Sequence, residues 1–162
     1  MAMQSLDDLF EHFLRDIYYA EKQILKALPK MARKADSEEL REAFESHRAE
    51  TEEHVATLEK VFESLDLKAR GVTCEAIDGI LEEGKEIMTE ATEPDTRDAG
   101  MIAAAQAVEH YEITRYGTLI AWAKQLGHDD AANLLATTLE QEYAADKKLT
   151  GLAEGVLNRE AA

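Results

Sequence analysis

The sequence is poor in cysteine, proline, glycine and long apolar runs. Cys74 is the only cysteine among 162 residues, which excludes an intrachain disulfide and a zinc site built from several thiolates. No run of apolar residues reaches the length of a transmembrane helix. With eight glycines, two prolines and no alternating clusters of β-branched residues, the sequence predicts long helices rather than strands.

Positive charge is scarce as well. Lysine and arginine number 18 against 34 aspartates and glutamates, for a formal net charge of −16. Such a chain repels phosphate backbones and anionic lipid headgroups, so neither a nucleic acid nor a membrane is an expected partner. The N-terminal segment has no basic or apolar region of a signal peptide. With 45% hydrophobic residues the chain can fold rather than form a disordered acidic tail, and its length suggests one domain over residues 1–162. Without a disulfide, a transmembrane helix or a signal peptide, we expect a soluble, cytoplasmic protein.

Apolar residues recur at spacings of three and four along four long segments, which predicts amphipathic helices. We expect these helices over residues 5–35, 37–66, 96–126 and 129–157. Ser5 fits an N-cap, Asp36 or Ser37 caps the second helix, and Gly127 stops the third. Pro29 lies inside the first helix and predicts a kink there.

The stretch from residue 67 to residue 95 has a different composition. It contains Gly71, Gly79, Gly84 and Pro94, and apolar spacing predicts one short helix over residues 75–90. We therefore expect a long crossover between two helical hairpins. An all-α, antiparallel four-helix bundle with one long crossover is typical of ferritin-like folds.

Acidic and histidine side chains interrupt the apolar stripe of every long helix near its midpoint. Burying an ionised carboxylate costs several kcal/mol unless it is paired or coordinated, and neighbouring carboxylates also repel. Metal cations would offset both effects, and carboxylate with imidazole suits iron or manganese. The sequence thus predicts metal cations at the centre of the bundle, iron first with manganese or zinc as alternatives, and no organic cofactor. The candidate ligands are Glu21, His47, Glu50, His54, Glu109, Glu112, Glu142 and Asp146.

The match to the known di-iron ligand pattern is partial. That pattern takes a Glu from each of two helices and a Glu-x-x-His pair from each of the other two. Here the second helix has His47-x-x-Glu50 or Glu50-x-x-x-His54, and the fourth has no histidine. We expect at most one of the two histidines to be a ligand. We also expect one of Glu109 and Glu112 to face solvent, with Glu112 better placed on the stripe.

Several alternatives stay open for the polar residues around these stripes. The acids could be buried carboxylates bonded to Tyr, His or Arg rather than ligands, with Arg115 a candidate partner. Tyr116 lies one turn from Glu112 and could donate to a ligand carboxylate. Cys74 is interpreted as a packing residue, and His110 as a surface residue.

Four segments together carry a resemblance to a known family. They are DIYYAEKQILKALPKMA (16–32), the run from His47 through Leu58, AAAQAVEHYEITRYGTL (103–119) and TLEQEYAADKKL (138–149). The chain resembles the YciE/YciF-like family of bacterial stress-associated proteins, in the ferritin-like superfamily, from about Leu6 to Leu157. The resemblance implies a rubrerythrin-like bundle that packs into homodimers and holds a dinuclear metal site. Gln141 stands where related chains often carry another acid.

Three functions follow as hypotheses. The first is a carboxylate-bridged di-iron or di-manganese protein that reacts with oxygen or peroxide, with metal ions and a second copy of the chain, bound through helix faces, as its partners. The second is iron storage in a ferritin-type cage. The third is a metal-free structural or interaction protein of the stress response. Nucleophile elbows, phosphate-binding glycine loops and dinucleotide fingerprints do not occur in the sequence.

Overall fold

The computed structural model describes residues 3–162, and its regular structure is helical. The long helices are α1 (Leu6–Lys34), α2 (Glu38–Ser64), α4 (Pro94–Gln125) and α5 (Asp129–Leu152). The crossover contains α3 (Glu75–Glu90), and a π-helical turn (Ala153–Leu157) leads from α5 into the short α6 (Asn158–Glu160). Among residues 3–162, no helix combines the length and apolar character needed to cross a bilayer.

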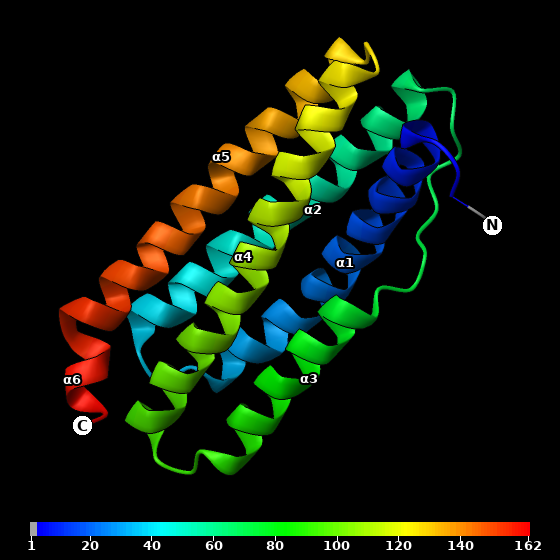
Figure 1. Ribbon diagram of the computed structural model, residues 1–162. Helices are drawn as coiled ribbons and strands as arrows, with labels where there is room; N and C mark the ends of the chain where they lie inside the picture. The colour runs from blue at the N-terminus through cyan, green and yellow to red at the C-terminus, as the bar shows by residue number, and fades with distance from the viewer. Residues whose placement is uncertain (1–2) are drawn as a thin grey trace.

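The four long helices pack side by side as an antiparallel bundle (Figure 1). Around the bundle the order is α1, α2, α5 and α4, because α1 packs on α2 and α4, and α5 packs on the same two helices. The crossover runs along the outside, where α3 lies against α4 and α1. The predicted ferritin-like four-helix bundle, with a crossover helix over residues 75–90, is confirmed.

Local sequence signals set several helix ends. Ser5 caps α1 through a reciprocal pair in which its hydroxyl accepts from the Asp8 N–H and its own N–H donates to the Asp8 carboxylate. Ser37 caps α2 by accepting from the Leu40 N–H. After α4, Gly127 adopts a left-handed conformation with φ of 78°. The following His128 N–H donates back to the Ala123 carbonyl at 2.8 Å, which closes the helix end.

Two predicted boundaries differ from the structure. Pro94 belongs to α4 as its first residue rather than to the crossover, because a proline there gives up an N–H that a helix start leaves unpaired anyway. Regular α-helix in the last segment ends at Leu152, and the chain continues as a π-helical turn. Pro29 lies inside α1, which nonetheless continues to Lys34.

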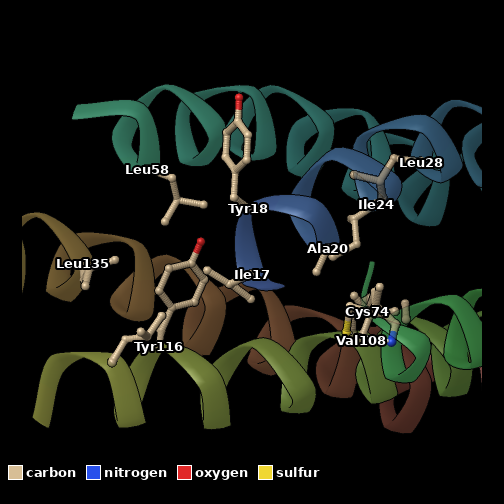
Figure 2. Packing of buried hydrophobic residues seen from close by; sticks show 14 of the residues in the cluster. Ile17, Tyr18, Ala20, Ile24, Leu28, Leu58, Cys74, Val108, Tyr116 and Leu135 are labelled. Atoms are coloured by element: carbon tan, nitrogen blue, oxygen red, sulfur yellow. Dashed lines mark hydrogen bonds between the residues drawn. The ribbon is translucent and has the colours of Figure 1, made fainter. Parts of the chain in front are cut away.

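The core between the four helices consists of aliphatic and aromatic side chains from every helix. Tyr116 reaches from α4 between Leu135 of α5 and Ile17 of α1 (Figure 2). All three side chains are completely buried. This packing surrounds the polar residues that interrupt the stripes.

Candidate metal centre

Six ionisable residues meet midway along the bundle, and we call them the core cluster. They come from all four long helices: Glu21 of α1, His47 and His54 of α2, Glu109 and Glu112 of α4, and Glu142 of α5. Each is buried: the four glutamates and His54 expose at most 2% of their surface, and His47 exposes 8%. The bundle therefore encloses four carboxylates and two imidazoles in a place that water hardly reaches.

The donor atoms of the core cluster form two groups that share one residue. His47, Glu109, Glu112 and Glu142 each offer an atom within 4.8 Å of the others' atoms, and the same holds for Glu21, His54 and Glu142. Glu142 is thus common to both groups. Two adjacent donor sets with a shared carboxylate have the composition of a carboxylate-bridged dinuclear site.

The imidazoles lie at different ends of the core cluster. His47 Nε2 is 2.9 Å from Glu109 Oε1 and 3.9 Å from Glu142 Oε2. His54 Nδ1 is 3.0 Å from Glu142 Oε1 and 3.3 Å from Glu21 Oε1. Tyr116 donates a hydrogen bond to Glu21, so the predicted contact between this tyrosine and a core carboxylate is present.

An outer partner holds the second nitrogen of each imidazole. The Glu50 carboxylate lies 3.2 Å from His47 Nδ1, and Gln141 Oε1 lies 2.8 Å from His54 Nε2. If each outer nitrogen donates its proton, the inner nitrogen presents its lone pair to the core cluster. Metal-binding histidines are oriented in this way by a second hydrogen bond. Sequence reasoning missed this role for Gln141, because its partner is 87 residues away.

Many donor atoms of the core cluster lack hydrogen bonds. Within residues 3–162, nine buried side-chain nitrogen or oxygen atoms have no hydrogen-bond partner, and all except Arg15 Nε belong to the core cluster. Both oxygens of Glu112 and both of Glu142 are among them. Buried polar groups are nearly always satisfied, so such a concentration of unpaired donor atoms fits a site that a cation would complete.

The electrostatics of the core cluster favour extra protons when no metal is bound. Burial and the repulsion from Glu142 and Glu21 raise the pKa of Glu112 well above its usual value. Burial also raises the pKa of Glu142, against the opposing effect of the His54 imidazole 3.0 Å away. The carboxylates of a metal-free core cluster are therefore partly neutralised by protons that a metal would displace.

The pKa values of the two imidazoles are raised as well, which favours their charged form. Burial works to lower the pKa of His47, but the neighbouring carboxylates of Glu109 and Glu50 outweigh it and raise this pKa well above the usual value. Burial also opposes a charge on His54, yet Glu142 and Glu21 raise its pKa to about 10. In the absence of metal, the core cluster therefore favours the positively charged form of both imidazoles.

The structure corrects one expectation about burial. Glu109 and Glu112 are both buried, so the prediction that one of them faces solvent is wrong. They are three residues apart and therefore only about 60° apart around the helix, which fits within one buried face. His47 and His54 both face the core cluster, because a spacing of seven is close to two full turns.

Two predicted ligands lie outside the core cluster. Glu50 is half-exposed at its edge and contacts the outer nitrogen of His47. Asp146 lies at the partly exposed boundary of α4 and α5, where it accepts hydrogen bonds from Gln106 and contacts His110 Nε2 at 3.1 Å. The contacts with Gln106 and His110 hold Asp146 at this boundary rather than in the core cluster.

Basic residues do not neutralise the core cluster. Within the described part of the chain, residues 3–162, no Lys or Arg forms an ion pair with any of its six members. Arg115, the candidate partner, lies 3.9 Å from Asp16 and stacks on Phe13 and Tyr111 instead. In a metal-free protein, bound protons rather than Lys or Arg side chains must therefore neutralise the carboxylates of the core cluster.

The amino-acid sequence matches a known protein family. The model of a domain of unknown function, DUF892, matches residues 5–162. The chain belongs to the DUF892 family. Protein YciF of Escherichia coli strain K12 is 46% identical over 162 residues, covering 99% of this chain and 98% of that protein.

Solved structures of DUF892-like chains show the same bundle. The crystal structure of the E. coli stress protein YciF superposes with a TM-score of 0.92 at 46% identity, over 96% of this chain and 99% of that one. YcfI from Rhodopseudomonas palustris, described as a putative structural protein, superposes with a TM-score of 0.89 at 51% identity, over 91% and 94% of the two chains. These likenesses support the ferritin-like architecture in which the core cluster is set.

Proposed function

We propose that this chain binds a dinuclear metal centre in the core cluster, with iron as the first metal and manganese or zinc as alternatives. The observation that carries the proposal is the set of buried, unpaired donor atoms contributed by Glu21, both histidines and the three other glutamates. Glu142 would be shared between the two metals, because it belongs to both donor groups. The donor set contains carboxylates and imidazoles without thiolate, which suits these metals.

We further propose that the bound centre reacts with oxygen or peroxide, since iron in such a site supplies redox chemistry when it is present. The chain's own residues prepare the site. Tyr116 donates its hydroxyl proton toward Glu21 and fixes that carboxylate. Glu50 and Gln141 orient the imidazoles, and the buried aliphatic residues around Glu21 and His54 shield that end of the core cluster from bulk water.

The biological setting is proposed from the relatives. The E. coli relative is described as a stress protein, and the identity of 46% over nearly the whole chain supports a similar setting here. A centre that consumes oxygen or peroxide suits a stress role. We propose no organic substrate from the core cluster alone.

Anaerobic titration with Fe(II) tests the metal proposal directly. We expect about two iron ions per chain, followed by oxidation on exposure to air or peroxide faster than in buffer. Glu142→Gln removes the shared carboxylate and should reduce the stoichiometry to one or less. Glu82→Gln, at a side chain 60% exposed on α3, is the matched control and should bind as the unaltered protein does. Stoichiometry well below two with no accelerated oxidation would exclude the proposal.

A metal-free structural role is the second candidate. It is favoured by the raised pKa values of His47 and His54, because two imidazolium groups can balance part of the carboxylate charge without a metal. The description of the R. palustris relative as a putative structural protein points the same way for that protein. Under this alternative, Fe(II), Mn(II) and Zn(II) leave the melting temperature unchanged, whereas binding to the folded state would raise it.

A further inference from the structure

A cavity lies beside the core cluster, and we call it the side cavity. It has a volume of about 130 Å³ and lies among α1, α2, α4 and α5, with Leu81 of α3 at one margin. Native cores contain few voids larger than a water molecule, so a space of this size is unusual. Its largest apolar lining residues are Ile24, Leu28, Met31, Phe44, Val108 and Leu149. Ile24 and Leu28 of α1 and Val108 of α4 are drawn in Figure 2.

The side cavity has one polar wall. His47, Glu50 and Glu109 line it, so it adjoins one donor group of the core cluster. Glu21, His54 and Tyr116 are not among its lining residues, and each of these three exposes at most 1% of its surface. A small molecule in the side cavity therefore reaches the end of the core cluster formed by His47 and Glu109.

The mouth of the side cavity lies between α2 and α5. Ser46, Ala144 and Lys148 line the cavity and are exposed to solvent, and Glu50 is half-exposed beside them. Small side chains at Ser46 and Ala144 leave this edge unobstructed. The polar residues at the mouth and at the inner wall limit apolar contact to the middle of the cavity.

We propose that the side cavity binds a small, mainly apolar organic molecule of benzene-like size that carries one hydroxyl or carbonyl group, and holds that group against His47 and Glu109. The inference rests on the proposed metal function, whose reactant it would supply, but the cavity itself is formed by the chain alone. A 150 Å³ cavity lined by aliphatic and aromatic residues accepts benzene, so about 130 Å³ admits a ring with a small substituent. A single polar group would meet the polar wall, and a second would be stranded among apolar side chains.

Binding can be measured on metal-free protein by ¹⁹F NMR with 4-fluorobenzyl alcohol as the probe. We expect saturable line broadening and chemical-shift changes. Ala145→Leu fills the side cavity from α5 and should weaken probe binding by about tenfold or more. Ala103→Leu adds the same volume at an exposed position of α4 and should leave binding unchanged.

A second filling variant protects the test against misfolding of the first. Ala27→Leu enters the same cavity from α1, and circular dichroism identifies which variants remain folded. Absence of saturable probe binding, or equal binding by the unaltered protein and a folded filling variant, would overturn the proposal. Iron stoichiometry of these variants separates the two proposals. If the protein loads iron normally but does not bind the probe, only the proposal about the side cavity is wrong. If it binds the probe but does not load iron, only the proposed metal function is wrong.

Discussion

At the scale of single residues, the core cluster raises the pKa of both imidazoles and of two carboxyl groups, which favours charge on the former and neutrality on the latter. Burial disfavours charge on every member, but the imidazoles gain from neighbouring carboxylates while the carboxylates repel one another. His54 therefore becomes easier to protonate, and Glu112 becomes harder to ionise. In both cases the folded, metal-free protein holds protons that the unfolded chain releases at neutral pH.

This proton uptake predicts how the stability of the metal-free protein depends on pH. The folded pKa of His54, about 10, lies above its unfolded value, so its contribution is complete below about pH 6.5 and is lost as pH rises toward 10. The raised pKa values of Glu112 and Glu142 act in the same direction. We expect the free energy of unfolding in urea, measured with EDTA, to fall between about pH 6.5 and about pH 9.5.

His54→Gln provides a further test of that prediction, because it removes one titrating group and also the imidazole that opposes the raised pKa of Glu142. The loss of stability that belongs to His54 should disappear, and the remaining fall with pH should follow the carboxyl groups. A stability that rises over the same interval would contradict the assignment of the bound protons to the core cluster.

Glu112→Gln separates a functional carboxylate from a structural one. The substitution replaces a buried, repelled acid by a neutral group of similar size, so we expect the metal-free protein to gain about 1 kcal/mol or more in unfolding free energy. It should lose any rise in melting temperature produced by Fe(II). Calorimetry with EDTA and with Fe(II) measures both effects, and destabilisation in EDTA would contradict the prediction.

At the scale of helices and connections, the crossover depends on close contact with α1. The Val72 N–H donates to the Arg15 carbonyl at 3.2 Å, and Gly71 packs directly on the backbone of Tyr19. A Cβ atom at Gly71 would lie 2.9 Å from Tyr19 Cβ and 3.2 Å from its Cα. Only glycine fits at position 71, because a Cβ atom there would clash with Tyr19, whose main-chain atoms are held in a helix and cannot move aside.

Gly71→Ala should lower the unfolding free energy by about 1–3 kcal/mol, because the added methyl group forces the crossover away from α1. Gly79→Ala is the matched control. Gly79 lies within α3 and its Cβ would meet nothing within 4 Å, so alanine should stabilise the protein by about 1 kcal/mol. Chemical denaturation of both variants measures the difference, and equal effects would contradict the packing argument.

At the scale of the whole molecule, the fold separates the acidic residues into two populations. Most of the 34 acids lie on outward helix faces, where water solvates them, and four glutamates lie in the core cluster. The outer helix faces also carry an aromatic side chain, Tyr143 of α5, which is 56% exposed. Tyrosine is enriched at protein–protein interfaces, so Tyr143 is the candidate contact for self-association of this chain.

The homodimer through helix faces remains a prediction, and light scattering tests it. We expect a mass of twice the 18.1 kDa of one chain. Tyr143→Arg should weaken the dimer if α5 is the face that pairs, whereas Thr118→Arg, at a hydroxyl that bonds its own helix backbone on α4, should not. A monomer would contradict the prediction, and a mass of many chains would favour the iron-storage alternative.

The sequence by itself determined the helical class, the crossover helix and the carboxylates at the stripe centres. These features depend on local periodicity and on helix caps such as Ser5, which a linear sequence contains. Glu21, Glu112 and Glu142 interrupt apolar stripes, so their burial could be predicted from spacing alone.

Only the tertiary structure decided the remaining members of the core cluster and the space beside it. Helical periodicity gives the direction of a side chain around its own axis, but the width of the buried face depends on how neighbouring helices pack. That width is why Glu109 and both histidines are enclosed while Asp146 lies at the boundary with α4. The partnership of His54 with Gln141 and the side cavity likewise depend on the relative position of helices along the bundle, which no single segment encodes.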